Sequence, residues 1–230
     1  MVTIKQALKE FLKEQRARLK PATYKGYDYA IDLFVDYLDG YAYQYLDEKD
    51  AKRYDKLYTE QDKEFSDVFG PKTVDSSMVS EFLNDFMIRK VICGKGFMRT
   101  VGTVMMRLVT WMHEKGYMGD KEHEDAMARV DAVKEDLPKV AEAAELIFDY
   151  AEDSPIGEVT KTLNSYFTIT RVKPGKLWFR DYMVGGKEIG PVPVSREISS
   201  LCEAGWAVSL ELGKTKEGWW ILQSGCVYPS

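Results

Sequence analysis

Residues 97–118 read FMRTVGTVMMRLVTWMHEKGYM, and this stretch decides the fold of the first half of the chain. At the helical period its apolar residues form one stripe, which predicts a helix of about four buried turns. The stripe consists of Val101, Val104, Met105, Leu108, Trp111 and Met112. The opposite face presents Arg99, Thr103, Arg107 and Thr110, at spacings of four, four and three residues. Guanidinium groups that alternate with hydroxyls suit an anionic backbone, and they equally suit a solvated helix face.

A second basic helix is predicted at the start of the chain. Thr3 and Gln6 have the spacing of a capping box, which begins a helix, and Pro21 begins the next one. The bases of the first helix follow one another at intervals of four, four, three and four residues, and they are Lys5, Lys9, Lys13, Arg16 and Lys20. Residues 1–25 contain seven Lys/Arg and two Asp/Glu, so this region carries a local positive charge. With Lys95, near the 97–118 helix, four of these bases are candidate phosphate contacts: Lys9, Lys13, Arg16 and Lys20.

The composition excludes several classes of protein. No apolar run approaches the roughly 18 residues of a membrane span, and the first residues lack the apolar core of a signal peptide. We therefore expect a cytoplasmic protein. Cys93, Cys202 and Cys226 fit neither a disulfide framework nor a zinc pattern, and the carboxylates occur as surface runs. We expect no cofactor, no metal and no membrane partner.

Residues 119–155 form an acidic segment, with 4 Lys/Arg against 12 Asp/Glu. Its apolar residues alternate at intervals of four and three, as in a coiled coil. They are Ala126, Val130, Val133, Leu137, Val140, Ala144, Ile147 and Ala151. Pro138 interrupts the pattern and predicts a kink or a division into two helices. The sequence leaves open whether 126–151 closes as a helical hairpin within one chain or forms the seam of a homodimer.

In the last third of the chain the apolar period changes from that of helices to that of strands. Two hairpins are predicted, one around Pro174-Gly175 and one around 214–217. About five or six short strands within 156–230 predict a small SH3-like or OB-like barrel. One exposed tryptophan, or Phe179 beside Arg180, would let this barrel stack on a base or hold a peptide.

Three segments of the first half together resemble a known family. They are TIKQALKEFLKEQRARLKPATYKGYDYAIDLFVDYL from Thr3, MVSEFLNDFM from Met78 and TVGTVMMRLVTWMHEKGYM from Thr100. Their pattern of hydrophobes and turns resembles the core-binding domain of phage integrases and other tyrosine recombinases. The residues that carry the resemblance are 19–23, Tyr27, Phe34, Trp111, Gly116 and Tyr117. The resemblance implies a SAM-like helical bundle that grips one side of duplex DNA.

The catalytic half of that family has no counterpart in this sequence. Strand cleavage in the family needs arginines and a His-x-x-Arg motif around a tyrosine, because the cations neutralise the phosphate that the tyrosine attacks. His113 and His123 are the two histidines, and neither begins that motif. We therefore expect a protein that is not an enzyme.

These patterns predict an α+β protein in three parts. Residues 1–118 form a SAM-like helical domain, 119–155 an acidic coiled-coil-like connector, and 156–230 a small β-barrel. The predicted function is binding of double-stranded DNA, as an accessory or regulatory relative of a recombinase. Sequence would be read by Arg99, Thr103 and Arg107, while the phosphate contacts would be Lys9, Lys13, Arg16, Lys20 and Lys95.

Two alternatives stay open. In one, the helical domain is a scaffold without nucleic-acid binding, and the connector and barrel assemble with a protein partner. In the other, the barrel binds RNA or a single strand. Net acidity favours the scaffold, whereas the two basic helices favour DNA.

The missing motif makes a first prediction. The purified protein should neither nick nor relax supercoiled DNA, and no tyrosine should become linked to phosphate, because the His-x-x-Arg motif that would activate the phosphodiester is absent. Agarose-gel relaxation and denaturing-gel assays with radiolabelled substrate measure both. A covalent protein–DNA adduct would contradict the prediction.

Overall fold

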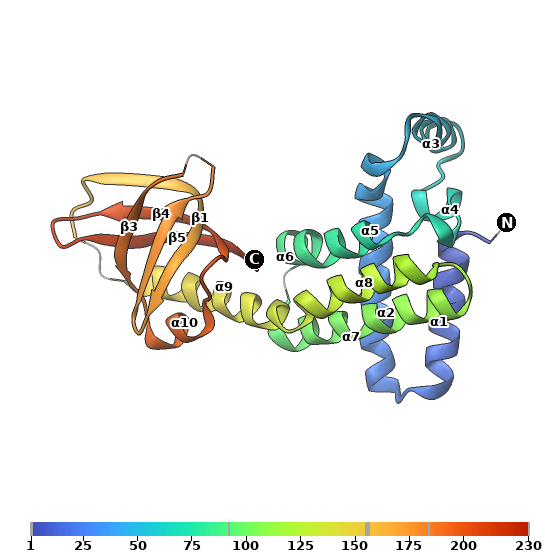
Figure 1. Ribbon diagram of the computed structural model, residues 1–230, viewed down its shortest axis with the longest axis horizontal. Coiled ribbons are helices and arrows are strands. Elements are labelled where there is room, and N and C mark those ends of the chain that lie inside the picture. Colours follow the sequence, from blue (N-terminus) through green and yellow to red (C-terminus); the bar gives the residue numbers. More distant parts are fainter. Residues whose placement is uncertain (1, 92, 155–156, 184, 230) are drawn as a thin grey trace. The chain divides into compact units, whose positions relative to one another are not determined.

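The computed structural model describes residues 2–91, 93–154, 157–183 and 185–229, and within them it shows an α+β fold. The chain divides into two compact units, which Figure 1 colours along the sequence. Unit 1 comprises residues 1–87 and 96–134, and unit 2 comprises 88–95 and 135–230. The expected connector 119–155 is therefore shared between the units and does not form a body of its own. Within the described ranges, every helix is too short or too polar to cross a membrane.

Unit 1 is helical, and the sequence signals for its helix starts are confirmed. The main helices are α1 (Ile4–Arg18), α2 (Pro21–Tyr41), α3 (Glu48–Gln61), α4 (Phe65–Val68), α5 (Ser76–Glu81), α7 (Lys95–Glu114) and α8 (Asp120–Lys134). Short turns are η1 (Ala42–Tyr45), η2 (Pro71–Thr73) and the π-helical η3 (Phe82–Phe86), which α6 (Met87–Lys90) follows. Thr3 and Gln6 form the predicted capping box, and Asp75 caps α5 by accepting the Met78 N–H at 2.8 Å.

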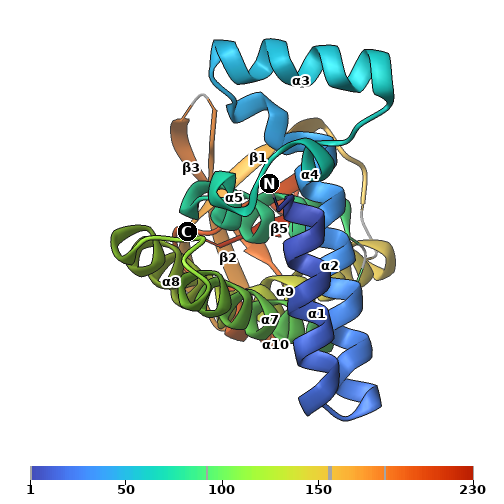
Figure 2. The ribbon, with the colours of Figure 1, turned by 90° about the vertical axis from the view of Figure 1, so that its right-hand side faces the viewer.

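Helix α7 buries its apolar stripe, as the sequence predicts, and helices α1 and α2 run side by side near it (Figure 2). The Phe11 ring of α1 meets Trp111 of α7 edge-on, with centroids 5.5 Å apart. Two glycines allow close packing on other sides of α7. A Cβ at Gly26 of α2 would lie 2.9 Å from Thr100, and one at Gly102 would lie 3.0 Å from the Cβ of Lys134 in α8.

Unit 2 contains an antiparallel sheet of five strands in the order β3-β2-β1-β4-β5. The strands are β1 (Lys161–Lys173), β2 (Lys176–Asp181), β3 (Gly185–Pro193), β4 (Ala207–Lys214) and β5 (Trp219–Tyr228), with the short helix α10 (Arg196–Leu201) after β3. Both predicted hairpins are confirmed, at 174–175 and 215–218.

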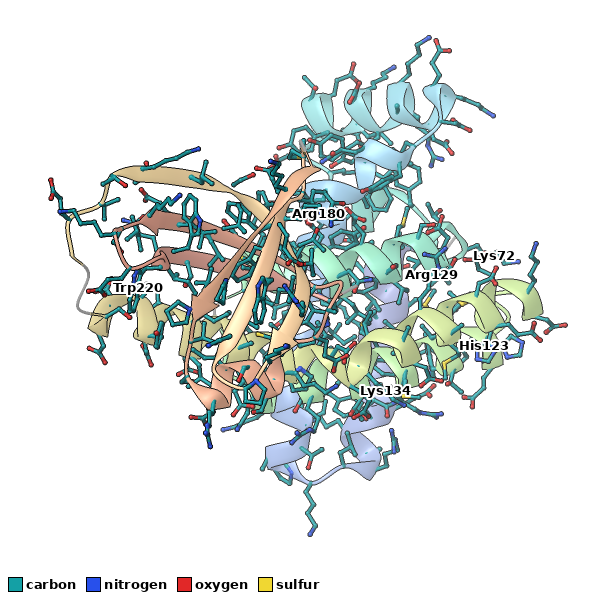
Figure 3. All side chains as sticks on the ribbon, turned by 60° about the vertical axis from the view of Figure 1, so that its left-hand side comes forward. Lys72, His123, Arg129, Lys134, Arg180 and Trp220 are labelled. Carbon is teal, nitrogen blue, oxygen red and sulfur yellow. The ribbon has the colours of Figure 1, made fainter. Side chains whose placement is uncertain are left out.

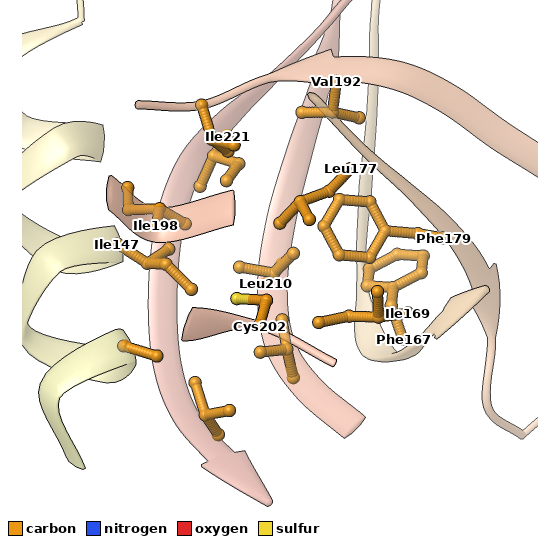
Figure 4. Close-up of a cluster of buried hydrophobic side chains, with 14 of the residues drawn as sticks. Ile147, Phe167, Ile169, Leu177, Phe179, Val192, Ile198, Cys202, Leu210 and Ile221 are labelled. Carbon is orange, nitrogen blue, oxygen red and sulfur yellow. The ribbon is translucent and has the colours of Figure 1, made fainter. Parts of the chain in front are cut away.

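The predicted closed barrel is wrong, because the sheet is open. Among the residues that the structure describes, the edge strands β3 and β5 share no hydrogen-bonded ladder. Pro191 and Pro193 lie on β3, and proline has no backbone N–H to offer a further strand. Helix α9 (Asp136–Asp153) packs against the opposite edge strand, β5. The core between this helix and the sheet contains Ile147, Ile198, Leu210 and Ile221 (Figure 4).

The apolar residues of the 126–151 repeat are buried in two separate cores, one in each unit. Val130 of α8 is buried within unit 1, whereas Val140 and Ile147 of α9 belong to the core of unit 2. Pro138 lies in the first turn of α9, where a proline is tolerated, so the helix begins there after the break at Glu135. The repeat is thus already covered within one chain.

This burial leads to a second prediction. Ile147→Asp should destabilise unit 2 by about 3 kcal/mol or more, because it places an unpaired carboxylate in the core. The neighbouring Phe148 is 53% exposed, so Phe148→Asp should change the stability by no more than about 0.5 kcal/mol. Chemical denaturation measures both values. If Ile147→Asp instead converted a dimer into a stable monomer in sedimentation, the repeat would be an intermolecular seam.

Candidate nucleic-acid interface

The two acids of residues 1–25 both face α7 and are occupied there. The Lys115 ammonium donates to Glu10 Oε1 and to Glu14 Oε1, each at 2.7 Å, and Trp111 Nε1 donates to Glu14 Oε2 at 2.8 Å. Hydrogen bonds from Lys115 and then from Trp111 lower the pKa of Glu14. The same pair of carboxylates raises the pKa of Lys115. We call these four residues the α1–α7 contact.

The α1–α7 contact fixes the direction of the basic residues on α1. Lys9 and Lys13 each precede one of these acids by one residue, so they point about 100° away from it around the helix axis. Both are exposed, as is Lys20 at the start of α2. In the described part of the chain none of these three lysines has an ion-pair partner. The predicted basic stripe is therefore present and uncompensated.

Arg16 completes this stripe. Its guanidinium carbon lies 5.7 Å from the centroid of the Tyr24 ring of α2, which positions a planar cation on the surface of the hairpin. Lys5, at the other end of the stripe, differs because it donates to Asp67 of α4 at 3.0 Å. Four bases thus stay available, and we call Lys9, Lys13, Arg16 and Lys20 the hairpin cluster.

Two further exposed bases near the α1–α2 turn were not among the predicted DNA contacts. Arg18 donates from Nε to Gln15 Oε1 at 2.6 Å, and Lys25 is exposed on α2. Neither falls on the four-and-three spacing of the stripe. The sequence signal that indicates them is the excess of Lys and Arg over Asp and Glu in residues 1–25, counted regardless of the helix face on which each residue lies.

The predicted DNA contacts on α7 differ from the hairpin cluster, because two of them already make polar contacts within the helix. Arg99 is exposed, and within the described residues it has no ion pair. The Thr103 hydroxyl donates to the Arg99 carbonyl at 3.0 Å, so its proton is used inside the helix. Arg107 Nη1 lies 3.4 Å from Glu114 Oε1, and its Nε is buried without a partner. Since a nearby carboxylate compensates it, Arg107 is a weak candidate for binding an anion.

Lys95 is the first residue of α7, one turn before Arg99, but its charge is already compensated. It is grouped with unit 2, where its ammonium lies 2.5 Å from Glu142 Oε1 of α9. Of the eight predicted residues, four therefore form the hairpin cluster and the other four, Lys95 among them, lie on α7.

Most of the candidate stacking aromatics of unit 2 are covered, although Trp219 and Trp220 of β5 are half-buried. Phe179 and Trp206 are completely buried in the core. Trp178 is 8% exposed and lies beneath Arg171, whose guanidinium carbon is 4.2 Å from the ring centroid. The expectation that Phe179 stacks on a base is therefore wrong, because this side chain faces the covered side of the sheet.

Other reactive groups give no second candidate. No group of three or more His, Cys, Asp or Glu side chains in the described ranges could hold a metal ion. Burial raises the pKa of the Cys202 thiol to about 12, which keeps it protonated. The rings of His113 and His123 stack with their centroids 4.3 Å apart, and Figure 3 labels His123 on α8.

Comparisons with protein-family models, with curated proteins and with solved structures found no match to this chain. The resemblance to the core-binding domain of tyrosine recombinases therefore stays a prediction from the sequence.

The α1–α7 contact generates a third prediction. Glu14→Gln should lower the free energy of unfolding by less than about 1 kcal/mol, because the ion pair is exposed and screened. The folded pKa of Glu14 lies below its usual value of 4.5, so this stabilisation is complete above pH 4.5 and is lost as the pH falls through the folded pKa.

The measurement is thermal unfolding of both proteins between pH 3 and 7. The difference between wild type and Glu14→Gln should shrink in acid. Glu60→Gln, an exposed position on α3, is the matched control and should show no difference at any pH. A Glu14→Gln difference that grows in acid would contradict the assigned partners.

Proposed function

We propose that the chain binds double-stranded DNA without cleaving it, through the hairpin cluster of unit 1. The observation that carries this proposal is the separation of charge on α1. Both acids of the region are neutralised against α7, while Lys9, Lys13, Arg16 and Lys20 stay exposed without acidic partners in the described chain. Four uncompensated cations along one helix and its following turn suit the phosphates of a duplex.

Such a surface binds the backbone more than it reads sequence. Lysines act as point charges toward phosphates and carry little base information. Thr103 and Arg107, expected to read base edges, have a hydroxyl proton and a guanidinium that are engaged within α7. The proposed binding is therefore strongly salt-dependent and weakly sequence-dependent. An accessory role beside a recombinase accords with it.

A protein-interaction scaffold is the second candidate, and one observation favours it. Three tyrosines between α2 and α4 are exposed: Tyr43 at 44%, Tyr45 at 54% and Tyr58 at 50%. Tyrosine is enriched at protein–protein interfaces. This candidate requires that the chain has no affinity for duplex DNA even at low salt, which separates it from the proposed function.

The fourth prediction tests the hairpin cluster. Binding of the full chain to a fluorescein-labelled 20-bp duplex should show a log–log salt slope of about −3.6, as expected for four phosphate contacts. The triple variant Lys9→Glu, Lys13→Glu, Lys20→Glu should flatten the slope to about −1, because a single contact is left. Fluorescence anisotropy over a salt series measures both slopes.

The matched control makes the same change of charge elsewhere in unit 1. Lys49→Glu, Lys56→Glu and Lys63→Glu lie on or just after α3, and all three positions are exposed. This variant should keep the wild-type slope. Equal losses in the two triple variants would show that net charge alone governs binding, and they would remove the hairpin cluster as the site.

A further inference from the structure

The outer face of the open sheet in unit 2, opposite the core, carries two exposed tyrosines and a third that is half-buried. Phe167 of β1 is completely buried, so Tyr166 points to the other side of the sheet, where it is 43% exposed. The backbone N–H of Tyr182 donates to the Tyr166 carbonyl at 2.7 Å, and Tyr182 is 63% exposed. The Tyr228 ring of β5 lies with its centroid 6.1 Å from that of Tyr166. We call these three residues the tyrosine row.

A shallow polar depression adjoins the tyrosine row. It has a volume of about 120 Å³, and the polar residues around it are Asn164, Ser209, Glu211, Gln223 and Ser224. Strand pairing places Ser209 directly opposite Tyr166, and it places Asn164 opposite Glu211. The depression therefore adjoins Tyr166, the member of the tyrosine row that lies on β1.

The lining of this depression has unused hydrogen-bonding capacity. Within the described residues, the side chains of Asn164, Ser209, Glu211 and Gln223 make no hydrogen bond. Ser224 pairs with Leu210 of the core, so its side chain faces the covered side of the sheet and does not contribute to the depression. Two amides, one hydroxyl and one carboxylate therefore offer both donors and acceptors.

Cations border the tyrosine row on the side of β2. Arg180 pairs across the strands with Thr168, two residues along β1 from Tyr166, and it is exposed without an ion pair in the described chain. Lys173 and Lys176 lie further along the same hairpin and are exposed. Figure 3 labels Arg180 and Trp220 at opposite ends of the sheet.

We propose that this face binds single-stranded nucleic acid. The tyrosine row would stack unpaired bases, the depression would hydrogen-bond the edge of one base, and Arg180 would contact the phosphate. A duplex cannot use this face in the same way, because its bases are already stacked and paired. Oligosaccharides also use aromatic and amide groups, but the Arg180 cation near Tyr166 favours a phosphate-bearing ligand. The site is independent of the hairpin cluster.

The fifth prediction tests the tyrosine row in the full chain. Fluorescein-labelled 12-nucleotide single strands of mixed sequence, as RNA and as DNA, serve as probes at low salt. Tyr166→Ala should weaken binding about tenfold, since one stacked base is lost, whereas Tyr166→Phe should bind within about twofold of wild type. Arg180→Ala should flatten the log–log salt slope by about 0.7.

Controls separate this site from a loss of folding and from the hairpin cluster. Phe148→Ala removes an equally exposed aromatic ring from α9 of the same unit and should leave binding unchanged. The triple variant of Lys9, Lys13 and Lys20 should lose duplex binding and keep single-strand binding. Melting temperatures establish that each variant is folded.

Three outcomes would overturn the proposal. One is the absence of single-strand binding at low salt, and another is wild-type binding by both Tyr166→Ala and Arg180→Ala. The third is binding of an oligosaccharide panel that is lost in Tyr166→Ala, with no binding of nucleic acid. If Tyr166→Ala does not fold, Arg180→Ala decides the test, because Arg180 is exposed and its replacement should not disturb folding.

Discussion

The orientation of α1 depends on its buried apolar face, where the Phe11 ring meets Trp111 of α7. Beside this contact the Glu14 carboxylate accepts hydrogen bonds from Trp111 and from Lys115, the residue that follows α7. Because the helix has one apolar side and one acidic side against its neighbours, its bases are left on the remaining surface. The charge separation on which DNA binding is proposed thus follows from a packing requirement of the core.

Much of the fold could be predicted from local signals. The capping box at Thr3, Pro21 at a helix start and Asp75 as a cap act within one helical turn, so a sequence reading finds them. Two features could not be predicted in this way. One is whether the sheet closes into a barrel, and the other is which core covers the apolar residues of 126–151. An interval of four and three is the same whether a helix buries its face in one core, in two cores or against a second chain. Strand alternation is likewise the same in open and closed sheets.

The candidate sites show the same division between local and long-range information. Spacing alone places Lys9, Lys13 and Arg16 on one face, and the structure keeps them there. Whether a charge is compensated depends on a neighbouring residue. For Arg107 that neighbour is Glu114, which lies seven residues, or two turns, further along the same helix. In unit 2 the aromatic that the sequence favoured, Phe179, lies on the covered face, and Tyr166 lies on the open one. Alternation separates two faces but does not say which of them a helix will cover.

The chain passes between the two units three times, after residues 87, 95 and 134. A truncation at residue 118, where the helical period first breaks, would remove α8 and leave the Gly102 side of α7 and the facing side of α5 uncovered. A truncation at 134 would retain residues 88–95 but remove the rest of the unit to which they belong. Neither unit is a contiguous module that gene fusion or recombination could exchange by a single cut. The two units are therefore constrained to be inherited, and synthesised on the ribosome, as one interleaved chain.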